Sequence, residues 1–152
     1  MEDVDRPLAP RGARAADRMC DYLNAEEIRP ELALCSSALR TRETLARILP
    51  GLGSELTVRI EPSVYSFDAD ALLQRLQQLP ADVGSVMLIG HNPAMQELAS
   101  LLAAGGDRLD ELRRGFPTAA LAELDLGGSW RELAPGTGRL TRFIVPRELG
   151  SG

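Results

Sequence analysis

The fold class follows from one segment, Val86-Met87-Leu88-Ile89-Gly90-His91-Asn92-Pro93. Its first four residues are all apolar, which is typical of a strand that is covered on both faces, as in a parallel sheet between two layers of helices. The next four residues turn the chain into a helix, because Asn92 is a good N-cap and Pro93 suits the first helical position. A buried strand, a tight turn and a helix in this order predict an α/β fold.

The residues on either side of this segment repeat the same alternation. Apolar residues at helical spacing predict four helices, over Arg11–Glu27, Thr41–Ile48, Leu72–Leu79 and Met95–Leu102. Short apolar runs predict two further strands, at Leu32–Cys35 and Leu56–Ile60. We therefore expect a three-layer α/β architecture, in which a mostly parallel sheet is flanked by helices.

After Gly105-Gly106 the pattern changes from helices to strands. A strand is predicted at Ala119–Leu126, a hairpin turn at Gly127-Gly128, and its partner strand at Trp130–Leu133. A last strand is predicted at Leu140–Val145, and with it a late antiparallel edge of the sheet. Because no repeat or linker interrupts the 152 residues, we expect one domain over 1–152.

Composition excludes several classes of protein. The net charge of −5 disfavours a protein that coats nucleic acid or an anionic membrane. The apolar runs are too short to span a bilayer, and the acidic N-terminus has no apolar signal region, so we expect a cytoplasmic protein. Two cysteines and one histidine are too few for a structural zinc site. All cationic residues are arginine, which indicates codon bias and excludes lysine chemistry.

Polar residues follow two of the predicted strands directly. Ser36 and Ser37 end the Leu32–Cys35 run, and His91 follows Val86–Ile89 by one residue. Ligands of open α/β sheets bind outside the carboxyl ends of the strands, so chemistry is expected at these two ends.

His91 is predicted to lie just before the N-terminus of a helix. That terminus has unpaired N–H groups and a positive partial charge, which favour a bound anion and disfavour protonation of His91. The alternative is a histidine that only completes a turn. The glycine before His91 and the Asn-Pro pair after it favour an anion site.

Arg40 is predicted in the first turn of the next helix, which Ser36 or Ser37 can cap. A cation in that turn opposes the helix dipole. Arg40 is therefore either a solvated surface residue or a group placed to bind an anion, and a guanidinium can bind phosphate oxygens in bidentate fashion. The position of Arg40 alone leaves both interpretations open.

Other signatures of phosphate binding and hydrolysis are absent. The sequence contains no GxxxxGK[ST], no GxGxxG after the first strand and no GxSxG. A cysteine phosphatase needs the spacing C-x5-R, whereas Cys35 and Arg40 have the spacing C-x4-R and Thr41 holds the required position. We therefore predict that Cys35 is a core residue at the end of a strand.

Three motifs together resemble those of the histidine phosphatase superfamily, which has the phosphoglycerate mutase-like fold. They are Asp5–Gly12, Cys35–Thr44 and Gly90–Met95, and Glu61–Tyr65 and Phe116–Ala120 also fit in order and spacing. Within the superfamily the chain is most similar to the short SixA-type phosphohistidine phosphatases. The resemblance covers essentially the whole chain.

This resemblance implies covalent transfer of a phosphoryl group to a histidine, followed by hydrolysis. By position, Arg40 corresponds to the second arginine of the phosphate pocket. His91 corresponds to the second histidine, which binds the phosphoryl group and is not the nucleophile. Arg6 is expected at the rim, and Ser36 in a loop beside the pocket. The expected partner is a phosphorylated protein carrying phosphohistidine, or a small phosphorylated substrate, with neither a metal nor an organic cofactor.

The chain also departs from the family pattern. The family opens with a central strand ending in Arg-His-Gly or Arg-His-Ala, which supplies the nucleophile, whereas the only histidine here is His91. Without that strand, two neighbouring strands would expose backbone groups. We expect that the start codon, or the chosen boundary of the chain, lies after the family's first strand. The chain as given is therefore expected to be inactive. The alternatives are a non-catalytic module that binds phosphorylated ligands, and a site in which His91 is the nucleophile. Glu43 and Glu97 are weak candidates for the proton donor.

Overall fold

The protein is described by a computed structural model, which places residues 1–150. Its helices are α1 (Pro10–Ala25), α2 (Leu39–Ile48), α3 (Ala69–Gln77), α4 (Ala94–Leu102) and α5 (Leu109–Arg114). Its strands are β1 (Leu32–Ser36), β2 (Thr57–Glu61), β3 (Val86–Ile89), β4 (Ala103–Gly106), β5 (Leu121–Leu126) and β6 (Gly138–Ile144). Short 3-10 helices are η1 (Asp3–Asp5), η2 (Leu49–Gly51), η3 (Pro62–Val64), η4 (Trp130–Glu132) and η5 (Pro146–Glu148).

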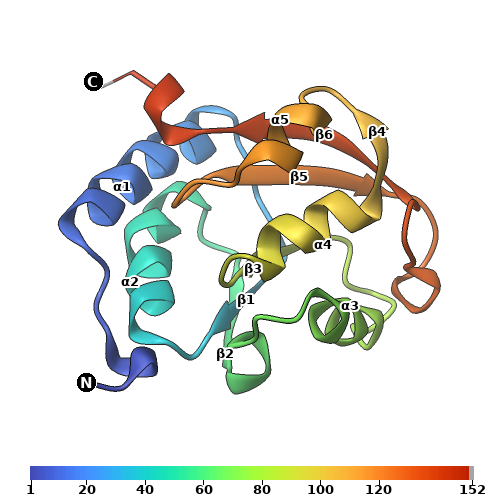
Figure 1. Cartoon of the computed structure of the whole chain (residues 1–152), viewed down its shortest axis with the longest axis horizontal. Coiled ribbons are helices and arrows are strands. Elements are labelled where there is room, and N and C mark those ends of the chain that lie inside the picture. The colour runs from blue at the N-terminus through green and yellow to red at the C-terminus, as the bar shows by residue number, and fades with distance from the viewer. Residues whose placement is uncertain (151–152) are drawn as a thin grey trace.

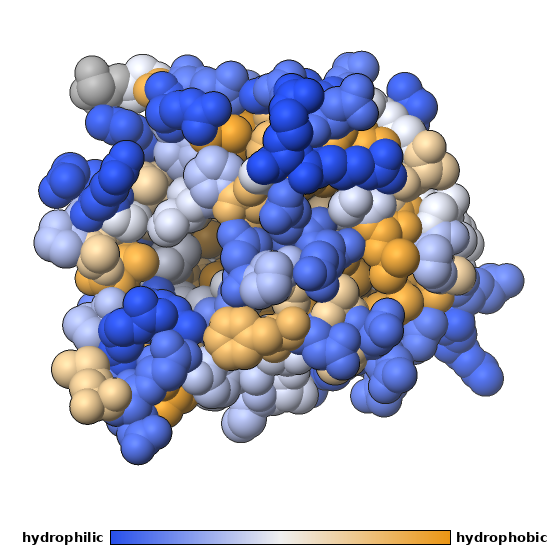
Figure 2. All heavy atoms as spheres, in the orientation of Figure 1, coloured by the Kyte–Doolittle hydropathy of each residue, from blue (hydrophilic) through white to orange (hydrophobic). Residues whose placement is uncertain are grey.

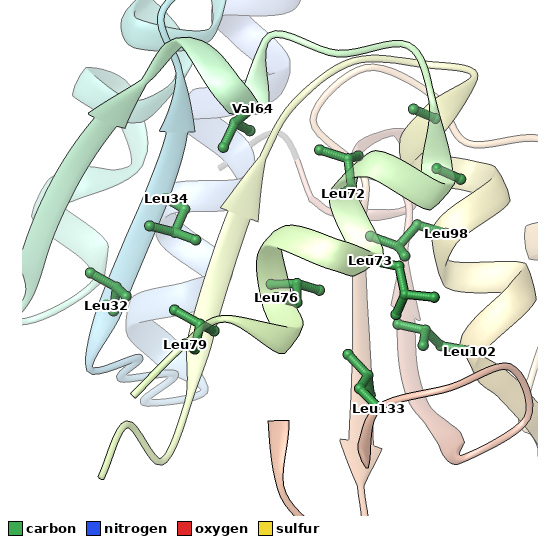
Figure 3. Close-up of a cluster of buried hydrophobic side chains, with 12 residues drawn as sticks. Leu32, Leu34, Val64, Leu72, Leu73, Leu76, Leu79, Leu98, Leu102 and Leu133 are labelled. Atoms are coloured by element: carbon green, nitrogen blue, oxygen red, sulfur yellow. The ribbon is translucent and has the colours of Figure 1, made fainter. Parts of the chain in front are cut away.

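The first sheet is parallel and has the strand order β2-β1-β3. Its central strand β1 is buried at all five positions, and its side chains alternate between two cores. Leu32 and Leu34 pack against α3 and α4, whereas Ala33 and Cys35 pack against α1 and α2. Figure 1 shows these two pairs of helices on opposite sides of the strands, and Figure 3 shows the leucines that fill the α3–α4 side. The predicted α/β class with a parallel sheet between helices is confirmed.

The second sheet has the order β4-β6-β5, with β4 parallel and β5 antiparallel to β6. The predicted antiparallel edge is therefore present, but the predicted hairpin between Ala119–Leu126 and Trp130–Leu133 is wrong. Trp130 begins η4, where Ser129 and Glu132 form a capping box, and the Trp130 indole donates a hydrogen bond to the Val83 carbonyl oxygen at 2.8 Å. These local bonds hold the segment as a helical turn, and β5 pairs with the last strand instead.

The facing edges of the two sheets are unpaired. Within residues 1–150, β3 pairs only with β1 and β5 only with β6. A cavity of about 1330 Å³ lies between these edges and extends to Arg40 and His91. The predicted full burial of Val86–Ile89 is therefore wrong, because all four residues border this cavity and are only half-buried. The exposed strand edges are those expected from the family resemblance.

Within residues 1–150, no helix combines the length and the apolar character that a membrane span requires. Figure 2 shows polar and charged residues over most of one face, with smaller apolar areas between them.

Candidate anion-binding site

The site lies where two adjacent parallel strands end. Cys35 of β1 is in register with Ile89 of β3, so the residues that follow both strands reach the same edge of the sheet. There an Arg40 guanidinium nitrogen, Nη2, lies 3.1 Å from Nδ1 of His91. The other ring nitrogen, Nε2, lies 2.7 Å from the Ser36 hydroxyl oxygen. The structure thus brings together three of the four residues predicted for the site.

The contacts of His91 define its tautomer. A guanidinium has only donor groups, so Nδ1 must accept the hydrogen bond from Arg40 and carry no proton. Nε2 then carries the proton and donates a hydrogen bond to the Ser36 hydroxyl oxygen, which also accepts a hydrogen bond from the Ala38 amide at 3.2 Å. His91 is only 6% exposed, and burial together with the positive charge of Arg40 lowers its pKa to about 4. The ring is therefore neutral at physiological pH.

The side chain of Arg40 is mostly buried, and its guanidinium already forms an ion pair within the protein. It is the second residue of α2, where a cation is unfavourable for the helix dipole, and its side chain is 16% exposed. The compensating group is Asp3. The Asp3 carbonyl oxygen accepts a hydrogen bond from Nη1 at 2.8 Å, and its carboxylate Oδ2 accepts one from Nη2 at 3.1 Å. Nothing in the sequence pattern links Asp3 to a residue 37 positions later, so sequence reasoning missed it.

Arg6, the fourth predicted residue, contacts the site through Asp3 alone. Its guanidinium donates to Oδ1 of Asp3 at 3.0 Å, and its side chain is 61% exposed. Two aromatic residues that were not predicted lie closer to the imidazole. The ring centroids of Tyr65 and Phe67 are 5.3 and 5.4 Å from that of His91, and the Tyr65 hydroxyl donates to Oδ2 of Asp3.

The predicted helix caps beside the site need correction. Neither Ser36 nor Ser37 caps α2, because Ala38 holds the N-cap position and the Ser36 hydroxyl is used by the Ala38 amide and His91. At α4 the N-cap position is Pro93, one residue later than the predicted N-cap Asn92. The Asn92 side chain still accepts a hydrogen bond from the Gln96 amide, at 3.3 Å.

The other residues considered for catalysis are Glu43, Glu97 and Cys35, and the surroundings of each indicate a structural or surface role. The Glu43 carboxylate accepts a hydrogen bond from the Leu8 amide at 2.8 Å and so holds the N-terminal segment, whereas Glu97 is exposed on α4. Cys35 is fully buried, as predicted, and burial raises the pKa of its thiol to about 11. No three His, Cys, Asp or Glu side chains of residues 1–150 are grouped so that they could hold a metal ion.

The pKa of His91 leads to a prediction about acid stability. The folded-state pKa of about 4 lies below the ordinary value of 6.5, so between these pH values the unfolded chain binds a proton that the folded protein does not. The free energy of unfolding should therefore fall as the pH is lowered from 6.5 to 4, by about 2 kcal/mol. Urea unfolding at a series of pH values measures this loss.

The variant His91→Gln serves as the control, because it should remove most of the loss between pH 6.5 and 4, leaving only the part near pH 4.5 that comes from glutamates with lowered pKa values. A second loss below pH 3.8 should remain, since hydrogen bonds from Tyr65 and the arginines lower the pKa of Asp3 from 3.8 to about 2. His91 is the only histidine, so its imidazole resonances report the pKa directly by NMR. A titration midpoint near 6.5 would contradict the buried, neutral ring.

Comparisons with known proteins agree with this architecture. No family model matches the sequence. An uncharacterized protein of Mycobacterium leprae is 33% identical over 148 residues, which are 95% of this chain and 89% of the relative. A solved structure from Nakamurella multipartitia, described as a candidate phosphohistidine phosphatase SixA, is 30% identical with a TM-score of 0.81, and the match covers 96% of this chain and 88% of that one. The protein histidine phosphatase SixA, solved with tungstate, is 25% identical with a TM-score of 0.77, and the match covers 97% and 88% of the two chains.

Proposed function

We propose that this chain, which belongs to the SixA-like family of the histidine phosphatase superfamily, binds a phosphoryl group between Arg40 and His91. The observation that carries this proposal is the 3.1 Å contact of the two side chains at the shared end of β1 and β3. A related SixA has been solved with tungstate, a tetrahedral oxyanion like phosphate, which supports an anion at this family's site.

Each of the three residues has a distinct part in the proposed binding. Arg40 offers two parallel N–H donors, which suit two oxygens of a phosphoryl group. Ser36 holds Nε2 of His91 and so fixes the orientation of the ring, with Nδ1 toward Arg40. A dianion beside the ring raises the pKa of His91, so Nδ1 can take up a proton and become a second donor to the phosphoryl oxygens.

The substrate class we propose is phosphohistidine in a protein, with a small phosphorylated metabolite as the second candidate. We propose that these 152 residues bind the phosphoryl group during phosphohistidine hydrolysis and do not supply the nucleophile. The chain has a single histidine, and both of its ring nitrogens are engaged by Arg40 and Ser36. A chain that binds phosphorylated proteins without hydrolysing them is the alternative.

Tungstate titration at pH 7.5 tests the binding proposal. We expect saturable binding at one site by calorimetry, together with a shift of the His91 imidazole resonances that saturates at the same concentration. The pKa of His91 should rise from about 4 when tungstate is bound, because the anion favours the protonated ring. Absence of saturable binding, or binding that leaves the His91 resonances in place, would exclude this site.

Turnover is measured with a phosphohistidine peptide on the wild-type chain and on His91→Ala. We expect no hydrolysis above background from either protein. Hydrolysis by the wild type that is lost in His91→Ala would instead show that the chain is catalytic and depends on His91, either as nucleophile or as phosphoryl ligand. Hydrolysis by both proteins at equal rates would refute the role given to His91.

A further inference from the structure

The N-terminal turn η1 places a carboxylate of the chain itself in the anion site. Asp3 is 37 residues from Arg40 and 62 residues from Tyr65 in the sequence, yet its Oδ2 accepts hydrogen bonds from Arg40 at 3.1 Å and from the hydroxyl of Tyr65. Its Oδ1 accepts a third from Arg6 at 3.0 Å. Two guanidinium groups and one phenol, contributed by three separate segments, thus converge on a single oxyanion.

This arrangement has the character of a binding site rather than of a surface ion pair. An isolated exposed pair has one donor and contributes little, whereas Asp3 has three charge-assisted or phenolic donors around it. The pKa of Asp3 falls to about 2, with the hydrogen bond from Tyr65 as the largest cause. A phosphoryl group carries the same negative oxygens and more charge, so the same donors suit it.

The turn that carries Asp3 is lightly attached. η1 contains no buried residue, and the Asp3 side chain is 44% exposed, so solvent and ions reach its carboxylate. The next side-chain contact that holds the N-terminal segment is the hydrogen bond from the Leu8 amide to the Glu43 carboxylate. Displacing Asp3 therefore exposes no buried core residue. The turn η1 can move out of the site while the hydrogen bond at Leu8 holds the rest of the segment in place.

We propose that Asp3 is a built-in competitor that occupies the oxyanion position, and that Tyr65 and Arg6 join Arg40 as ligands of the phosphoryl group that displaces it. This inference rests on the proposed function and adds two binding residues and a regulatory contact to it. While Asp3 is docked, the site is closed to other anions, and the apparent affinity is reduced by the fraction of molecules in which the site is free.

Tungstate titration of Asp3→Ala tests the competition. We expect its Kd to be about tenfold lower than that of the wild type, as for a site that is closed in roughly nine molecules of ten. The matched control is Asp5→Ala, which removes the same charge from the same turn but none of the three contacts. It should bind tungstate within about twofold of the wild type.

A structural role for Asp3, in which it holds Arg40 in place, predicts the opposite result. Asp3→Ala would then bind tungstate as weakly as the wild type or more weakly, and the inference would be overturned while the proposed function stands. Equal gains in Asp3→Ala and Asp5→Ala would also overturn it, because net charge would then explain them. Binding by none of the proteins would overturn both proposals together.

The role of Tyr65 is tested in the Asp3→Ala background. If Tyr65 is a ligand of the anion, Asp3→Ala/Tyr65→Phe should bind tungstate about tenfold more weakly than Asp3→Ala, since one hydrogen bond to a charged group is lost. If the Tyr65 hydroxyl only anchors Asp3, its removal should have no effect once Asp3 is absent, and that part of the inference would be wrong. Circular dichroism and the His91 resonances verify that both variants are folded.

Discussion

Replacement of Arg40 by alanine is expected to raise the Kd for tungstate about a hundredfold or more. The guanidinium offers two donors at the site, and a hydrogen bond to a charged group contributes about 1.5 to 3 kcal/mol. Two such bonds correspond to at least a hundredfold in affinity. Among residues 1–150, no other side chain forms hydrogen bonds with both His91 and the carboxylate of Asp3, and no second guanidinium reaches His91, so no neighbour can replace Arg40. Calorimetry at pH 7.5 measures the change.

Two further variants show whether the geometry or only the charge matters. Arg47→Ala removes the same charge from the far end of α2, where Arg47 pairs with Asp17 on the surface, and it should leave binding within about threefold. Arg40→Lys keeps the charge but loses the planar pair of donors, so its Kd should lie between those of the wild type and Arg40→Ala. Equal losses of tungstate affinity in Arg40→Ala and Arg47→Ala would show that net charge alone explains the effect.

The core of this site was predictable because topology brings its parts together. Ser36 is the last residue of β1 and His91 follows β3, and strands that are parallel and adjacent must end at the same edge of the sheet. The apolar runs at Leu32–Cys35 and Val86–Ile89 were enough to predict both strands, and β1 extends one residue further, to Ser36. The ends of all parallel strands lie at one edge of the sheet, but only the structure shows that β1 and β3 are neighbours there.

The outer part of the site was not predictable from the sequence. Asp3 and Tyr65 are 62 residues apart and meet only because η1 and the residues after η3 both lie beside Arg40. No periodicity relates a short turn near the N-terminus to a loop that precedes α3. Long-range contacts between irregular segments leave no local pattern, so three-dimensional coordinates were required.

The second half of the chain was predicted less well than the first, for reasons of composition. β4 is Ala-Ala-Gly-Gly, which has none of the β-branched or aromatic residues typical of strands. It forms because the backbone of Gly106, with a φ of +133°, packs directly on Leu140 of β6, where a side chain would not fit. α5 has only six residues, too few for a helical period to stand out.

A large loss of stability is expected when Leu72 is replaced by alanine. Leu72 lies on α3 and is fully buried in a hydrophobic core that also contains Leu34 of β1 and Leu98 of α4 (Figure 3). Truncation of a buried leucine removes apolar contacts and leaves a cavity that rigid neighbours cannot fill, which costs about 3 kcal/mol. A protein of this size has about 5 to 15 kcal/mol of stability, so this is a substantial fraction of the whole.

Urea unfolding followed by the fluorescence of Trp130 measures this loss. Trp130 is the only tryptophan and packs against the same core as Leu72. The midpoint should fall by about 1.5 M with an unchanged slope, because the surface exposed on unfolding is nearly the same. Leu49→Ala is the control, since Leu49 is 38% exposed and should cost less than about 1 kcal/mol. If Leu72→Ala cost no more than Leu49→Ala, the α3 side of the sheet could not be the close-packed core described above. A loss near 3 kcal/mol with tungstate affinity retained at low temperature would show that the anion site depends on the ends of β1 and β3 and not on the packing of α3.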